Sequence, residues 1–157
     1  MKSKPFSKNL NTQRSASRLA AVQALYQIEF GGSTAGAVIQ EFIDRRLGAK
    51  IDGDQYAEAD HNFFRLVVSG EMGQREEIDK LLQNSLGDKH SLTKMDGILR
   101  ALLRAATFEL LMQKDIPMRV ILDEYINVAH AFYSGPEPKL VNGVLDNLAH
   151  HVRSEKL

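Results

Sequence analysis

Apolar residues recur at steps of three and four positions along most of this chain, and no segment alternates at the two-residue spacing of a strand. The pattern is strongest in a segment that runs from Ser91 or Thr93 to Gln113, where the apolar face is so broad that most of a helix there must be buried. The apolar positions are Ile98, Leu99, Leu102, Leu103, Ala106, Leu110 and Leu111. The sequence therefore predicts an all-α fold with its core helix in this segment.

The same period predicts further helices over residues 12–30, 34–47, 56–86 and 117–132, and a last one that ends near Val152. Each of the first three has a local signal. Gly31-Gly32 should stop the first helix, Ser33 or Thr34 should cap the second, and Gly70 and Gly73 should kink or divide the third. Residues 49–55 should form a loop around an Asp-Gly turn.

Composition excludes several classes of protein. The 157 residues include no cysteine, which rules out disulfide frameworks, thiolate zinc sites and cysteine nucleophiles. No apolar run approaches the roughly 20 residues that cross a bilayer, and the N-terminal residues lack the apolar core of a signal peptide. We expect a cytoplasmic protein with no membrane association.

Charge is balanced overall, at 20 basic and 20 acidic side chains, but it is unevenly distributed. Residues 1–30 hold five cations and one acid, and residues 1–11 are expected to form a flexible basic arm. Arg14 and Arg18 are four positions apart near the start of a helix, where they repel each other and face the positive end of the helix dipole. Such a disfavoured pair indicates an anion site, suited to phosphates. The alternative is a pair of solvent-facing arginines behind a solvated tail.

No pattern for catalysis stands out, and no catalytic, cofactor-binding or metal-binding residue is predicted. The signatures of metalloproteases, phosphate-binding loops, dinucleotide-binding folds and serine hydrolases are missing. Glu58 and His61 have a spacing used in helical di-metal proteins, but such sites need the motif twice. Asp146 and His150 are better explained as a surface contact four residues apart.

Asn142 and Gly143 interrupt an otherwise apolar helix start, KLVNGVLD. A glycine inside a helix costs about 1 kcal/mol relative to alanine. We expect Gly143 to allow close packing of helices and Asn142 to cap or hold a neighbouring backbone segment.

Four segments, in order and at matching distances, resemble the NusB family of transcription antitermination factors. They are residues 14–26 (RSASRLAAVQALY), 98–110 (ILRALLRAATFEL), 116–132 (IPMRVILDEYINVAHAF) and 139–146 (KLVNGVLD). The resemblance covers about residues 12–152.

The resemblance implies a bundle of about seven helices in two packed subdomains, over residues 12–88 and 89–152. The last residues are mostly charged, and we expect a frayed tail at 153–157. The resemblance further implies a protein without catalysis that binds single-stranded boxA-type RNA together with the ribosomal protein NusE. The pair would join the elongating RNA polymerase complex and support ribosomal RNA transcription. Some family members are monomers and others pair, so a homodimer that covers the basic surface is an open alternative.

The resemblance also indicates which residues bind RNA. Arginines of the first segment should contact phosphate, and Tyr26 should stack on RNA or lie in the core. Because only two arginines are kept there, Lys2, Lys4 and Lys8 should add to the affinity. The full predicted set is Lys8, Arg14, Arg18, Gln23, Tyr26, Lys89, Lys94, Lys139 and Asn142.

Two rival functions stay open at this point. One is a helical scaffold that binds only protein, whose basic arm serves solubility. The other is a detached RNA-targeting module of an RNA methyltransferase, since NusB-like domains occur fused to such enzymes. The chain is too short to hold a cofactor-binding α/β domain as well, so this reading needs a separate partner chain.

Overall fold

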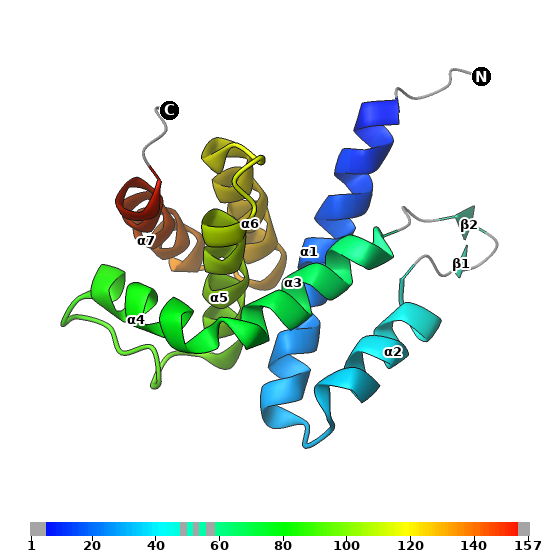
Figure 1. Cartoon of the computed structure of the whole chain (residues 1–157), viewed down its shortest axis with the longest axis horizontal. Coiled ribbons are helices and arrows are strands. Elements are labelled where there is room, and N and C mark those ends of the chain that lie inside the picture. Colours follow the sequence, from blue (N-terminus) through cyan, green and yellow to red (C-terminus); the bar gives the residue numbers. More distant parts are fainter. Residues whose placement is uncertain (1–5, 48–49, 52–53, 56–58, 154–157) are drawn as a thin grey trace. The chain divides into compact units, whose positions relative to one another are not determined.

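The computed structural model describes residues 6–47, 50–51, 54–55 and 59–153, and places their side chains except in residues 6–11 and the two short strands. The described residues form seven helices (Figure 1). These are α1 (Phe6–Phe30), α2 (Ala35–Arg45), α3 (His61–Gly73), α4 (Arg75–Leu86), α5 (Gly97–Met112), α6 (Met118–Phe132) and α7 (Glu137–Val152). The all-α prediction is confirmed.

The ends of the early helices follow their local signals. α1 stops before Gly31-Gly32, where Gly32 has a φ of 76°, and the Thr34 hydroxyl accepts a hydrogen bond from the Ala37 amide at 3.2 Å to cap α2. The long third helix is divided after Gly73, as expected.

Three segments differ from the sequence expectations. Residues 6–11, expected in a mobile arm, form the first turns of α1, because no glycine or proline interrupts residues 6–30. The loop expected at 49–55 contains two antiparallel strands of two residues each, β1 (Lys50–Ile51) and β2 (Asp54–Gln55). The core helix starts at Gly97, several residues after the expected start at Ser91 or Thr93. The reason is that the Asp96 side chain caps the helix by accepting a hydrogen bond from the Leu99 amide at 3.2 Å.

The chain is compact in two units, Met1–Ser69 and Gly70–Leu157, which divide within α3. The predicted split near residue 88 falls one helix later and remains a prediction. In the first unit α1 packs against α2, and Phe42 of α2 stacks on Phe64 of α3 with ring centroids 5.7 Å apart. These two rings are fully buried at the centre of that unit.

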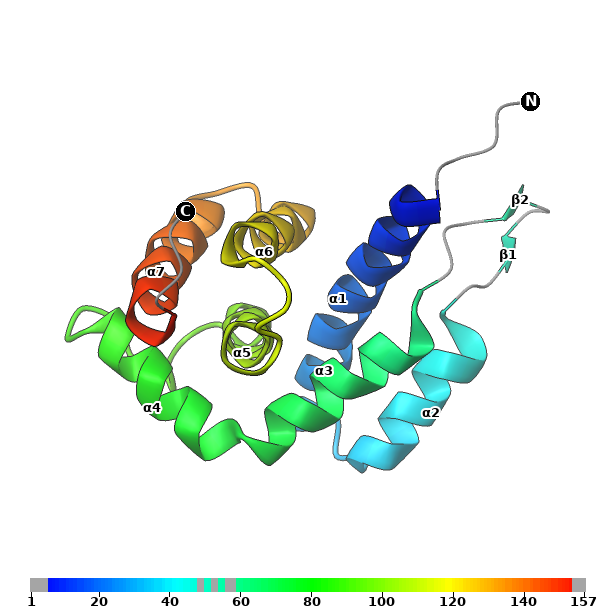
Figure 2. The same cartoon turned by 45° about the horizontal axis from the view of Figure 1, so that its top comes forward.

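The second unit is built around α5. Figure 2 looks nearly along α5 and shows α4, α6 and α7 around it, and all three helices contact it. Its broad apolar face is buried as predicted, and α3 approaches it closely at Gly70, where a Cβ atom would overlap the Phe108 ring. The buried Glu109 carboxylate accepts a hydrogen bond from the Tyr125 hydroxyl of α6 at 2.5 Å.

Arg153 closes the C-terminal end of α5, although the sequence placed this residue in a frayed tail. Its buried guanidinium donates hydrogen bonds to the carbonyl oxygens of Leu110 at 2.9 Å, Gln113 at 2.8 Å and Ile116 at 2.6 Å. A helix leaves its last carbonyls without partners inside the helix, and here a side chain from 40 residues away satisfies them.

Tyr133 ties the end of α6 to the start of α5, because its hydroxyl donates to the Asp96 side chain that caps α5. Burial, together with the hydrogen bond and the negative charge of Asp96, raises the pKa of Tyr133 above its ordinary value of 10. The contact fixes the chain just ahead of α7.

Arg153→Ala should lower the free energy of unfolding by about 3 kcal/mol, because it leaves several buried carbonyls unpaired. Urea denaturation measures this loss. The control is Arg119→Ala, which removes an exposed arginine 3.9 Å from Asp123 and should cost about 0.5 kcal/mol or less. Equal losses for the two variants would contradict the assigned role of Arg153.

The raised pKa of Tyr133 predicts a pH dependence of stability. Above about pH 10 the unfolded chain loses the phenol proton while the folded chain keeps it, so the stability that Tyr133 contributes below this pH is lost as the pH rises. The stability advantage of the wild type over Tyr133→Phe should therefore shrink between about pH 9 and pH 11 in urea denaturation. A stability difference between the wild type and Tyr133→Phe that does not change with pH would contradict the raised pKa of Tyr133.

Candidate nucleic-acid interface

Asp60 joins the arginine segment of α1 to the first turn of α3. Its amide donates to the Gln13 carbonyl at 3.2 Å, and its own carbonyl accepts from the Ser17 hydroxyl at 2.7 Å. Its side chain caps α3 by accepting from the Phe63 amide at 2.9 Å. The backbone and side chain of Asp60 thus hold both helices. The arginines on either side of Ser17, Arg14 and Arg18, are therefore placed against α3.

Arg14 is a partly exposed cation beside this contact between α1 and α3. Its guanidinium lies over the Phe63 ring, 4.7 Å from the centroid, and its Nε atom is 3.9 Å from Asp60 Oδ2. About a third of the side chain, 35%, is exposed, while the Nε atom is buried and has no hydrogen-bond partner among the described residues. The aromatic face and the carboxylate hold the cation in place and leave part of it open to an anion.

Arg18 lies over the same Phe63 ring but is buried. Its guanidinium lies 4.9 Å from the Phe63 centroid, and the residue is 3% exposed. The electron-rich ring attracts both cations and offsets the repulsion expected from their spacing. Of the two arginines predicted to contact phosphate, the structure leaves Arg14 accessible and places Arg18 in the packing between α1 and α3.

The other predicted residues of α1 point in different directions. Gln23 is half-buried and lines a cavity of about 170 Å³ between α1 and α2, together with residues that include Phe42 and Arg46. Tyr26 is 39% exposed and pairs with the exposed Phe30, their centroids 4.9 Å apart, so it does not lie in the core. Lys8 lies in α1, but its side chain is outside the described residues, as are Lys2 and Lys4.

Lys89 and Lys94 are exposed on the connector between α4 and α5. The buried Arg100 of α5 orders this connector, because its guanidinium donates hydrogen bonds to the carbonyls of Leu92 at 3.2 Å and Met95 at 2.7 Å. Sequence reasoning missed this positioning role, for which the signal is a charged residue on a helix that is otherwise buried.

Gln83 of α4 holds the first part of the same connector, and sequence reasoning missed it as well. Its side chain donates to the His90 carbonyl at 2.9 Å and accepts from the Leu92 amide at 2.9 Å. The two lysines therefore stand on a connector that is fixed from both sides.

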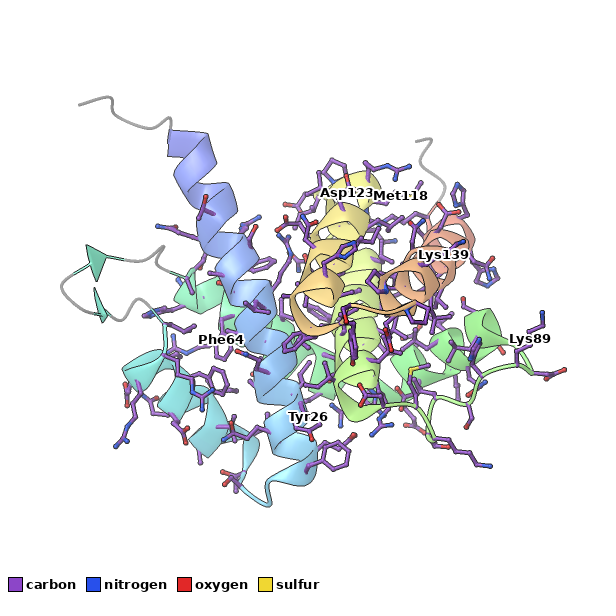
Figure 3. All side chains as sticks on the ribbon, turned by 180° about the vertical axis from the view of Figure 1, so that it is seen from behind. Tyr26, Phe64, Lys89, Met118, Asp123 and Lys139 are labelled. Atoms are coloured by element: carbon purple, nitrogen blue, oxygen red, sulfur yellow. The ribbon has the colours of Figure 1, made fainter. Side chains whose placement is uncertain are left out.

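Lys139 and Asn142 are exposed, one helical turn apart, near the start of α7. Figure 3 shows Lys139 on this helix and Lys89 beyond the end of α4. Gly143 is also exposed, and a Cβ atom built there meets nothing within 4 Å. The expectation that Gly143 allows close packing of helices is therefore wrong, and Gly70 has that role instead.

The described residues contain no group of three or more histidine or acidic side chains placed to hold a metal ion. Asp146 and His150 form the expected surface contact, with His150 Nδ1 3.7 Å from Asp146 Oδ1. Glu58, the proposed neighbour of His61, lies outside the described residues. No helix in the described part of the chain is long and apolar enough to span a membrane.

Comparison with known proteins agrees with this architecture. Transcription antitermination protein NusB of Allorhizobium ampelinum is 50% identical over 150 residues, which cover 96% of this chain and 93% of that protein. The structure of T. maritima NusB matches with a TM-score of 0.73 and 32% identity, over 90% of this chain and 94% of that one.

A third similar structure holds the antitermination factors NusB and NusE in complex with double-stranded RNA. It matches with a TM-score of 0.74 at 19% identity, over 88% of this chain and 97% of that one, and so supports the fold. Residues 15–150 match the NusB family. With a family match over most of its length and a half-identical relative, this chain belongs to the NusB family.

Proposed function

We propose that this chain is a transcription antitermination factor that binds single-stranded boxA-type RNA together with NusE. The pair joins the elongating RNA polymerase complex in the cytoplasm and supports ribosomal RNA transcription. The protein acts by binding and carries out no catalysis. The name of the half-identical relative, a transcription antitermination protein, supports this function.

The observation that carries the RNA-binding part is the geometry of Arg14. A partly exposed guanidinium is held between an aromatic ring and a carboxylate, on a helix joint that Asp60 fixes. Phosphate contacts from lysine and arginine supply a large share of the affinity of nucleic-acid-binding proteins, and a preordered side chain loses less entropy on binding. The exposed Lys89, Lys94, Lys139 and Asn142, all in the second unit, are further proposed RNA contacts.

NusE is the protein partner that this function requires. The exposed Tyr26–Phe30 pair offers an aromatic surface of the kind enriched in protein interfaces. Tyr26 therefore has two candidate ligands, RNA and protein, and binding measurements with and without NusE separate them.

The direct test is fluorescence-anisotropy binding of a short boxA-like RNA and a scrambled RNA at several salt concentrations, with and without NusE. The wild type should prefer boxA, and NusE should tighten binding. Arg14→Ala should weaken binding and flatten the slope of log affinity against log salt by about 0.7, the value for one phosphate contact to a single strand.

Arg18→Ala and Arg119→Ala are the matched controls. Arg18 is buried, so its loss should destabilise the fold without changing the salt slope, and Arg119 is exposed on α6 outside the predicted set. If boxA and scrambled RNA bind equally weakly even with NusE, the proposed function is wrong and a protein scaffold takes its place. If all three variants lose the same slope, the assignment of the phosphate contact to Arg14 is wrong.

A further inference from the structure

The cavity between α1 and α2 has the size and the lining of a pocket for one aromatic ring. It lies within the first unit and has a volume of about 170 Å³. An apolar cavity of roughly 150 Å³ in another protein takes up benzene. Six of the side chains that line it carry no polar group, and these are Ala16, Leu19, Ala20, Phe42, Leu47 and Ala59. Such a lining favours an apolar ring over an ion or a sugar.

The Gln23 amide gives this cavity one polar end. The residue is half-buried, and its side chain forms no hydrogen bond within the part of the chain that the structure describes. An amide offers both donors and an acceptor, and among apolar side chains it gains from a partner that uses them. A ring that carries a hydroxyl group supplies such a partner, because a buried tyrosine hydroxyl usually forms a hydrogen bond.

Arg46 lies where the cavity meets the solvent. Its guanidinium is 4.6 Å from the centroid of the Phe42 ring, and its side chain is 51% exposed. Planar guanidinium groups stack on aromatic rings, so a second ring can lie against the exposed part of Arg46. Its charge is partly balanced, because Glu41 Oε1 is 3.9 Å from Arg46 Nη2. Arg46 therefore suits a ring better than a phosphate.

The surface of α1 beside the cavity suits a protein better than a nucleic acid. Residues 19–28 of this helix contain no charged side chain. Tyr26, which Figure 3 labels on α1, and Phe30 are both exposed further along the same helix. RNA requires cations opposite its phosphates, whereas protein interfaces have aromatic centres with few charges.

We propose that the cavity between α1 and α2 is an anchor pocket for a tyrosine side chain of a protein partner. The ring fills the apolar space, its hydroxyl forms a hydrogen bond with the Gln23 amide, and one edge of the ring lies against Arg46. The choice of partner, a protein of the antitermination complex, rests on the proposed function. The pocket itself is a site separate from the phosphate contact at Arg14.

The first experiment uses p-cresol, which has the structure of a tyrosine side chain, as the probe. Nuclear magnetic resonance follows the glutamine side-chain amides and the leucine methyl groups of the full chain during titration. The signals of Gln23, Leu19 and Leu47 should shift and saturate in the millimolar range. Toluene, which lacks the hydroxyl group, should bind more weakly, and uridine should not bind in this pocket.

Two variants test the pocket and its polar end separately. Ala16→Leu fills the cavity, so it should abolish the shifts caused by p-cresol without lowering the melting temperature. Gln23→Met keeps the size of the side chain and removes the amide, so p-cresol should lose its advantage over toluene. The matched control is Ala37→Leu, at an exposed position of α2 that does not line the cavity, and it should bind p-cresol like the wild type.

The second experiment tests the protein source of the ring. Fluorescently labelled wild type, Ala16→Leu and Ala37→Leu are titrated with purified NusE and with a purified RNA polymerase elongation complex that carries boxA RNA and NusE. Ala16→Leu should bind one of these partners about ten-fold or more weakly, as the loss of a central interface anchor does. Its affinity for boxA RNA alone should equal that of the wild type, because Arg14 is unchanged.

The outcomes separate this inference from the proposed function. If p-cresol causes no shift at Gln23, or if Ala16→Leu leaves the shifts in place, the pocket is wrong whatever the protein does with RNA. If uridine binds in the pocket and p-cresol does not, the ring is an RNA base. If p-cresol binds but Ala16→Leu joins both partners with wild-type affinity, the ring belongs to a free phenol and the protein anchor is wrong. A wild type that binds neither boxA RNA nor the elongation complex overturns the proposed function and the choice of partner with it.

Discussion

The candidate RNA site depends on the joint that Asp60 makes between α1 and α3. One residue caps α3, accepts from Ser17 and donates to Gln13, and its carboxylate stands beside Arg14. A cation on a long side chain is usually mobile and loses entropy when it binds. Here an aromatic ring and a fixed carboxylate hold it before any ligand arrives, and this preorganisation is the reason why we propose Arg14 as an RNA contact.

The arginines of this chain divide into two physical roles. Arg100 and Arg153 are buried and donate to backbone carbonyls, so they order a connector and close a helix end. Their planar groups with several donors suit this use, because one side chain can satisfy several carbonyls at once. Arg14 keeps part of its charge at the surface. A count of basic residues therefore overstates the surface available to an anion, and burial decides which arginines can bind one.

The sequence predicted the helix faces and helix ends that depend on local periodicity and on local capping residues. Residue spacing predicted the buried face of α5, a helix cap at Ser33 or Thr34, and a kink or division at Gly70 and Gly73. The structure places the cap at Thr34 and the division after Gly73. The sequence did not predict interactions between distant positions, such as Ser17 with Asp60, which are 43 residues apart. The same limit explains Gly143, because a glycine looks alike in sequence whether a neighbouring helix or solvent faces it.

The central claim is that Arg14, held on Phe63, meets RNA while Arg18 on the same ring does not. Nuclear magnetic resonance of the arginine Nε–H groups tests it directly during titration with boxA-like RNA. The Arg14 signal should shift with boxA and less with scrambled RNA, while the Arg18 signal should stay in place. An unchanged Arg14 signal under conditions where boxA RNA is bound would contradict the account.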